Sequence, residues 1–149
     1  MPVELVTTPT AEIHAALNAL IPQLSRSAPP LTWEQFESFV AQPDVHFFVF
    51  RGEGEGAPVP QAPVLGMASL ATFAIPTGLR GWVEDVVVDK AARGQGAGQQ
   101  LVEAMLDKAR ELGLATVDLT SRPSREEANR LYVRCGFVPR ETNIYRYSV

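Results

Sequence analysis

Three closely spaced glycines behind an arginine are the residues of this chain best suited to hold a ligand. Residues 83–88 are rich in valine and predict a β-strand, and Arg93-Gly94-Gln95-Gly96-Ala97-Gly98 follows, directly before an apolar stripe with helical spacing. The first turn of a helix leaves four N–H groups without intrahelical partners and carries a partial positive charge. Because glycine has no Cβ, a bulky phosphate can approach the main chain. The sequence therefore predicts a cradle for an anionic phosphate group.

Two other phosphate motifs can be compared with this loop. The pattern G-x-x-x-x-G-K-[ST] is absent, because Gln99 and Gln100 follow Gly98 where Lys and Ser or Thr are required. The dinucleotide pattern G-x-G-x-x-G also fails, because the third glycine comes one residue early. Asp118 does lie near the place where that pattern expects its ribose-binding acid. A nucleotide-binding α/β domain is therefore weakened as an alternative and stays open.

Two blocks of the sequence together resemble the GCN5-related N-acetyltransferase (GNAT) family. The family's signature is Arg or Gln followed by x-x-Gly-x-Gly or Ala after a strand, and residues 93–98 match it. A second block, Asn129-Arg130-Leu131-Tyr132-Val133-Arg134-Cys135-Gly136-Phe137, is similar to the family helix that carries an Asn and a Tyr before a Gly-Phe turn. The resemblance covers essentially the whole chain as one domain, residues 1–149. It implies an α/β (α+β) fold with a mixed central sheet of about six to seven strands flanked by four helices.

The resemblance also implies acetyl-CoA as co-substrate and no metal. The pantetheine arm of the cofactor would pair with the main chain of Val86, Val87 and Val88 like an added strand. Asn129 would touch this arm or a bound water. The diphosphate would meet the phosphate cradle, which consists of Arg93, Gly94, Gln95, Gly96, Ala97 and Gly98.

The resemblance points to Tyr132 as the acid that protonates the departing thiolate, since a phenol has a pKa of about 10 and a thiol about 8.5. A core tyrosine is the alternative. For the base, Glu84 and Asp85 are neighbours on a strand, so their side chains leave on opposite faces. Glu84 is expected to share a face with Val86 and Val88 and is our candidate, with an ordinary polar contact as the alternative.

The elements that must position these residues are predicted in the order β-α-α-β-β-β-α-β-α-β-β. A helix crosses between the fourth and fifth strands, so these two strands must be parallel. Helices are expected after Thr8-Pro9, after a capping box of Thr32 and Gln35, after Gly98, and after a capping box of Ser124 and Glu127. Residues 52–60 are expected to form a loop. The predicted strands are Val3–Thr7, Val45–Phe50, Val64–Phe73, Trp82–Val88, Ala115–Thr120, Phe137–Val138 and Asn143–Val149.

Composition excludes several classes of protein. A length of 149 residues with 46% hydrophobic content suits one globular domain, and a net charge of −4 without a basic run argues against nucleic acid as a partner. One cysteine and two histidines form neither a metal site nor a thiol-enzyme pair. We see no signal peptide and no apolar run long enough to span a membrane, so we expect a cytoplasmic protein. The resemblance to the family also allows a homodimer.

The leading hypothesis is an N-acetyltransferase that moves an acetyl group from acetyl-CoA to a primary amine in a ternary complex. A catalytically silent acyl-CoA-binding or regulatory domain is the alternative. The run Glu84–Val88 is similar to that of glucosamine-phosphate acetyltransferases. Small amines, amino acids, peptide N-termini and protein lysines all remain open as acceptors.

Overall fold

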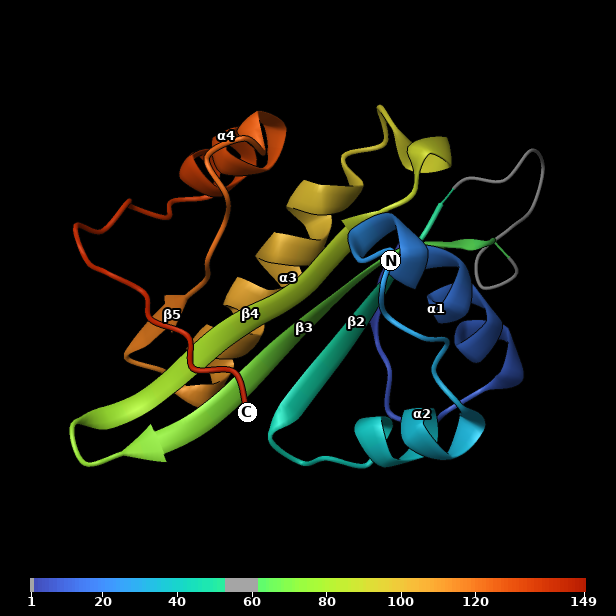
Figure 1. Cartoon of the computed structure of the whole chain (residues 1–149), viewed down its shortest axis with the longest axis horizontal. Helices are drawn as coiled ribbons and strands as arrows, with labels where there is room; N and C mark the ends of the chain where they lie inside the picture. Colours follow the sequence, from blue (N-terminus) through green and yellow to red (C-terminus); the bar gives the residue numbers. More distant parts are fainter. Residues whose placement is uncertain (1, 53–61) are drawn as a thin grey trace.

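Within residues 2–52 and 62–149, which the computed structural model describes, five strands form one mixed sheet with helices on both faces (Figure 1). Strands β1 to β4 are antiparallel to their neighbours, and β5 is parallel to β4. The elements, in chain order, are β1 (Val3–Leu5), α1 (Ala11–Leu24), α2 (Trp33–Val40), β2 (Val45–Arg51), β3 (Val64–Ile75), β4 (Gly78–Val88), a 3-10 turn (Lys90–Ala92), α3 (Ala97–Leu112), β5 (Thr116–Asp118) and α4 (Glu126–Arg134).

The sheet separates two hydrophobic cores. Alternate residues of β2 point to opposite faces, so Phe48 packs with Leu101 and Met105 of α3, while Phe47 packs with Leu17 of α1 and other apolar side chains of that face. Helices α1 and α2 therefore cover one face of the sheet and α3 covers the other (Figure 1). No helix in the described part of the chain is long and apolar enough to cross a membrane.

Local capping signals explain where α2 begins but not where α4 begins. The predicted capping box is present at α2, where the Thr32 side chain accepts from Gln35 N–H at 3.1 Å and Gln35 returns a bond to Thr32 N–H. The predicted box of Ser124 and Glu127 is wrong. Arg125 N–H instead donates to Arg122 O in a turn, so Arg125 becomes the N-cap residue and no side chain caps α4.

The predicted fold class is confirmed, but the sheet is shorter than expected. Residues 137–149, which contain the two predicted closing strands, belong to no helix or strand and pair with no strand of the described chain. A strand needs a partner edge, and β5 offers an edge of only three residues. The predicted loop of residues 52–60 lies almost entirely outside the described residues.

Candidate functional site

Strands β4 and β5 are parallel, as the sequence predicts, and they separate at their carboxyl ends. They are parallel and in register only from Arg80 opposite Thr116 to Trp82 opposite Asp118. Strand β4 then continues alone on that side to Val88. The main chain of Val86, Val87 and Val88 therefore borders an opening between the two strands, where an extended ligand could add to the sheet edge.

The glycine loop lies at the end of β4 and leads directly into α3. Gly94 and Gly96 adopt the left-handed region, with φ of 80° and 69°, and Gly96 is the N-cap residue of α3. Ala97, Gly98 and Gln99 follow as the first three helical residues, whose N–H groups have no acceptor within the helix. The predicted phosphate cradle thus has the geometry of an anion site at a helix N-terminus.

Gly98 has a packing role that the sequence interpretation missed. A Cβ added at Gly98 would lie 2.9 Å from Leu131 Cδ2 of α4, closer than real contacts of this kind. A Cβ added at Gly94, in contrast, would meet nothing within 4 Å. The absence of a side chain at Gly98 therefore lets the Leu131 side chain of α4 lie close to α3, whereas the sequence pattern predicts that all three glycines serve the ligand.

Basic side chains from distant parts of the sequence gather beside this loop. A hollow of about 580 Å³ lies between the end of α1, residues 86–90 and the start of α4. Asp89 is its only acidic lining residue, and it is already engaged: its carboxylate accepts from Ala91 N–H and Gln23 Nε2, which lower its pKa. Of the basic lining residues, only Arg93 belongs to the glycine-loop motif, because the others come close to the loop only in the folded chain. The basic lining residues are Arg26, Lys90, Arg93 and Arg125.

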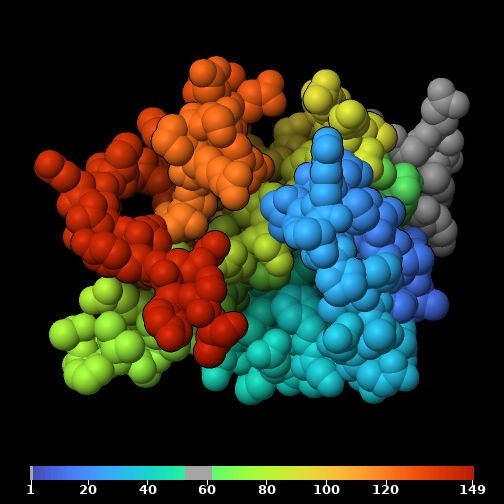
Figure 2. All heavy atoms as spheres, in the orientation of Figure 1, coloured from blue at the N-terminus to red at the C-terminus, as the bar shows by residue number. Residues whose placement is uncertain are grey.

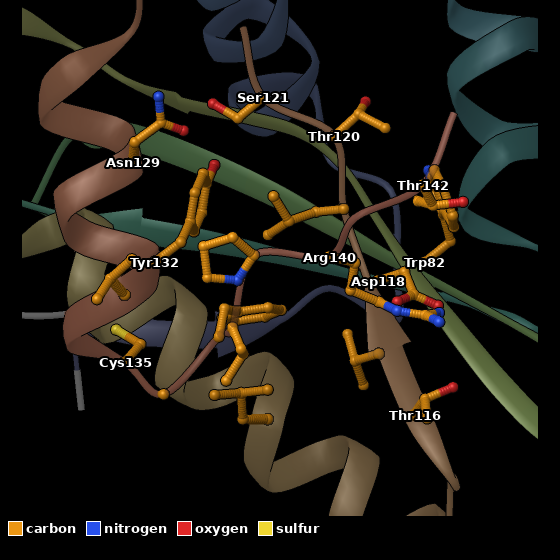
Figure 3. A pocket seen from close by; sticks show the side chains of 18 of the residues that line it. Trp82, Thr116, Asp118, Thr120, Ser121, Asn129, Tyr132, Cys135, Arg140 and Thr142 are labelled. Carbon is orange, nitrogen blue, oxygen red and sulfur yellow. The ribbon is translucent and has the colours of Figure 1, made fainter. Parts of the chain in front are cut away.

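A larger hollow of about 1500 Å³ lies between β5, α3, α4 and residues 138–144 (Figure 3). Tyr132 and Asn129 reach it from one side of α4, and the Tyr132 hydroxyl points toward the space near Asn129 and Ser121. Ser121 Oγ is buried and has no hydrogen-bond partner among the described residues. Asn129 Nδ2 donates to Arg122 O at 3.0 Å, so it also orders the loop after β5.

The Tyr132 side chain is well placed to hold a proton. It is only 7% exposed and packs edge-on against Phe137, with ring centroids 5.9 Å apart. Burial raises the pKa of the phenol, so Tyr132 stays protonated at neutral pH. The neighbouring Cys135 lines the same hollow, and burial raises the pKa of its thiol as well.

A β-bulge in β4 changes the expected placement of the carboxylates. Glu84 lies opposite Ser69 and Val87 lies opposite Met67, so two residues of β4, Asp85 and Val86, face one residue of β3. Asp85 has a φ of 53°, the one positive value at a non-glycine residue in the described chain. The extra residue interrupts the alternation of side chains between the two faces.

The predicted face of Glu84 is therefore wrong. Val83 packs in the core under α3, but Val87 packs in the core under α1, although a regular strand would place both on one face. Val86 and Val88 pack toward α3, so Glu84 lies on the opposite face, the one that α1 and α2 cover in part. The alternation on which the prediction relied ends at Asp85.

Glu84 and Asp85 have different surroundings. Glu84 accepts a hydrogen bond of 2.8 Å from Trp82 Nε1, which lies two residues earlier on the same face. Partial burial raises the pKa of Asp85, and the charge of Glu84 raises it further. Among the residues that the structure describes, no group of three His, Cys, Asp or Glu side chains could hold a metal ion.

Comparison with known proteins identifies relatives of the whole chain. The model of the acetyltransferase (GNAT) family matches residues 13–137. Glucosamine 6-phosphate N-acetyltransferase 1 of Oryza sativa subsp. japonica is 34% identical over 142 residues, which cover 92% of this chain and 82% of that protein. Aminoalkylphosphonate N-acetyltransferase of Salmonella typhimurium is 30% identical over 143 residues, covering 92% and 86%.

The fold of this chain is also similar to that of a solved acetyltransferase structure. The crystal structure of glucosamine-6-phosphate N-acetyltransferase from Arabidopsis thaliana superposes with a TM-score of 0.78 over 99% of both chains, at 22% identity. At this identity the superposition speaks for the fold alone.

The packing role of Gly98 can be tested with Gly98→Ala. Alanine normally stabilises a helix relative to glycine by about 0.5–1 kcal/mol of unfolding free energy. Here we expect that gain to be cancelled or turned into a small loss, because the new Cβ would displace the end of the Leu131 side chain. Urea denaturation measures the change. Glu103→Ala, an exposed change in the same helix, is the control and should stay within about 0.5 kcal/mol of the parent. A Gly98→Ala protein that is more stable than the parent by about 0.5–1 kcal/mol would contradict this role.

Proposed function

The chain belongs to the acetyltransferase (GNAT) family and is an acetyl-CoA-dependent N-acetyltransferase, and we propose that its acceptor is a small primary amine carrying a phosphate or phosphonate group. The two relatives that match over almost the whole chain are named for glucosamine 6-phosphate and for aminoalkylphosphonates. These compounds differ in their carbon skeleton but share a primary amine and a phosphorus-bearing anion. This shared chemistry carries the proposal.

Cations near the separated ends of β4 and β5 support an anionic acceptor. Arg26, Lys90 and Arg125, which lie outside the phosphate cradle, line the smaller hollow, and Arg140 lines the larger one. The phosphate cradle already offers main-chain N–H groups to the cofactor. Cations from other elements could thus bind the anion of the acceptor, for which an arginine side chain has a well-matched donor geometry.

Acetyl-CoA would supply the acetyl thioester that is cleaved, and the residues present fit it. We assign its diphosphate to the cradle of residues 93–98 and its extended arm to the main chain of Val86, Val87 and Val88, with Asn129 close by. The unpartnered Ser121 Oγ near Tyr132 is a further group able to bond a polar atom of the cofactor.

Acetyl transfer to an amine needs a base, an oxyanion donor and an acid. The amine nitrogen forms a bond to the acetyl carbon as the carbon–sulfur bond breaks, and the electron pair of that bond stays on sulfur. A main-chain N–H of the segment Val86–Val88 would stabilise the charge on the acetyl oxygen. We assign the proton for the sulfur to Tyr132, whose raised pKa keeps its hydroxyl protonated.

Glu84 remains our candidate for the base, although it lies on the face of β4 opposite to Val86 and Val88. It lies on the face that α1 and α2 leave partly open, and the Trp82 indole N–H fixes one of its carboxylate oxygens. An amine entering over this face would approach the edge of β4 from the side of Glu84, while Val86 and Val88 pack toward α3 on the other side. Asp85, at the bulge, is the rival.

The acceptor class is tested by a panel of amines with release of free thiol as the readout. We expect kcat/KM for glucosamine 6-phosphate or 2-aminoethylphosphonate to exceed that of the matched amines without phosphorus, glucosamine and ethylamine, by about 10-fold, because only the phosphorus-bearing anion can form charge-assisted hydrogen bonds with these cations. Equal rates with and without the anion would contradict the proposal. A peptide N-terminus acetylated faster than every small amine would replace it with the peptide alternative.

Tyr132→Phe tests the acid. The variant keeps the ring packed against Phe137 but removes the proton donor, so kcat should fall about 100-fold while the Kd for acetyl-CoA changes little. Steady-state kinetics and calorimetry measure the two quantities. Tyr147→Phe, which removes a hydroxyl that is exposed to solvent, is the matched control and should keep full activity. Full activity of Tyr132→Phe would remove Tyr132 from the mechanism.

Paired variants distinguish the two carboxylates. Glu84→Gln should lower kcat/KM about 100-fold, because an amide cannot take the proton from the amine. Asp85→Asn should keep kcat/KM within about three-fold of the parent. A large loss in Asp85→Asn with little loss in Glu84→Gln would transfer the role of base to Asp85.

A further inference from the structure

One of the two tryptophans of the chain belongs to neither hydrophobic core. Trp82 lies near the middle of β4 and is only half-buried, and within the described residues it packs in neither of the two apolar clusters. Trp33, in contrast, packs edge-on against His14 and Phe36, with ring centroids 5.6 and 5.9 Å away. A large aromatic side chain that the fold does not use for packing is a candidate for contact with a ligand.

The Trp82 side chain points to the face of the sheet that α1 and α2 leave partly open. Val83 packs toward α3, so the preceding side chain points the opposite way. Val117 of β5 also packs toward α3, which places Asp118 on the same face as Trp82. Trp82 and Asp118 are partners in the parallel pair of strands, and Figure 3 shows Trp82 beside Asp118 and Arg140. The indole ring thus lies among polar side chains rather than in a core.

The same ring reaches the larger hollow. Among the described residues that line the hollow of about 1500 Å³, Trp82 is the one that comes from β4, and Tyr132 lines this hollow as well. Figure 2 shows yellow-green atoms, in the colour range of β4, between the red atoms of the C-terminal residues and the blue atoms of α1. The hollow that holds the candidate acid therefore extends to an open part of β4 that carries the Trp82 ring.

The indole N–H links this ring to the candidate base. It donates to Glu84 Oε1 at 2.8 Å, and no second hydrogen bond or ion pair to Glu84 is present within residues 2–52 and 62–149. The Glu84 side chain is exposed, so without this bond it would be free to adopt several rotamers. A carboxylate accepts hydrogen bonds through both of its oxygens. The bond from Trp82 therefore holds one oxygen in place and leaves Oε2 available to an amine.

We propose that Trp82 is a positioning residue for acetyl transfer: its N–H fixes the Glu84 carboxylate, and its ring forms the wall on which the carbon skeleton of the acceptor lies. The proton of the amine passes to Glu84 Oε2 as the nitrogen bonds to the acetyl carbon. A shift of a reacting group by about 1 Å can lower the rate about 100-fold, so one hydrogen bond to the base can control kcat. The proposal rests on the assignment of Glu84 as the base, and it holds whether or not the acceptor carries phosphorus.

Two substitutions separate the effect of the N–H from that of the ring. Trp82→Phe keeps an aromatic ring without the donor, so kcat should fall about 10-fold while KM for the acceptor stays within about three-fold of the parent. Trp82→Gln places an N–H at the same number of bonds from Cα but has no ring, so it should keep more of kcat than Trp82→Phe and raise KM about 10-fold. Steady-state kinetics with the best amine of the panel measure both quantities.

The control is Trp33→Phe, the same change at the other tryptophan, which should keep the kcat and KM of the parent. Circular dichroism verifies that each variant folds. Three results would each overturn the proposal: a Trp82→Phe variant with the kcat of the parent, a Trp82→Gln variant with the KM of the parent, or equal losses of kcat in these two variants.

A double-mutant cycle tests whether Trp82 acts through Glu84. The double variant Trp82→Phe/Glu84→Gln should lose no more kcat than Glu84→Gln alone, because the group that Trp82 positions is already gone. Additive losses would contradict the positioning role. A Glu84→Gln variant with the kcat of the parent would refute the assignment of the base and this proposal with it. A large loss in Glu84→Gln beside an unaffected Trp82→Phe would refute this proposal alone.

Fluorescence tests the contact between the ring and the acceptor without turnover. In Trp33→Phe, Trp82 is the one remaining indole, and adding the best amine of the panel to protein saturated with coenzyme A should change its emission along a saturable curve. In Trp82→Phe, where Trp33 remains, the same titration should leave the emission unchanged. If the Trp82 emission stays constant at concentrations that saturate the kinetics, the ring does not form the wall and the proposal is wrong.

Discussion

One extra residue in β4 determines what each side of the sheet presents to a ligand. The bulge at Asp85 turns Val86 and Val88 toward α3 while Glu84 and Trp82 stay on the face of α1 and α2. Without it, the carboxylate and the valines would share one face, as in any regular strand. The bulge thus lets one strand offer its main-chain edge to the cofactor and a carboxylate to the acceptor from the opposite side.

Packing between helices links the phosphate cradle to the proton donor. Gly98 lies in the first turn of α3, and its lack of a side chain allows Leu131 of α4 to come close. Tyr132 follows Leu131 directly, so the contact that seats α4 also determines where the phenol lies. The loop to which we assign the diphosphate and the helix that carries our candidate acid therefore meet at this contact.

Local signals in the sequence were sufficient for the loop, the parallel strands and the start of α2, because each depends on a few adjacent residues. Non-local features could not be predicted. The bulge at Asp85 depends on pairing with β3, and the basic lining of Arg26, Lys90 and Arg125 depends on how the chain folds. The prediction of two closing strands was wrong for a related reason: an alternating pattern specifies a strand but not the sheet edge that the strand joins.

The raised pKa of Cys135 matters in an enzyme whose product is itself a thiol. Each turnover releases coenzyme A, and Cys135 lines the hollow that also holds Tyr132. A thiolate there could exchange with oxidised coenzyme A and form a mixed disulfide that blocks the site. Burial raises the pKa of the Cys135 thiol and so lowers its share of thiolate, the form that attacks a disulfide, which slows this exchange beside the enzyme's own product.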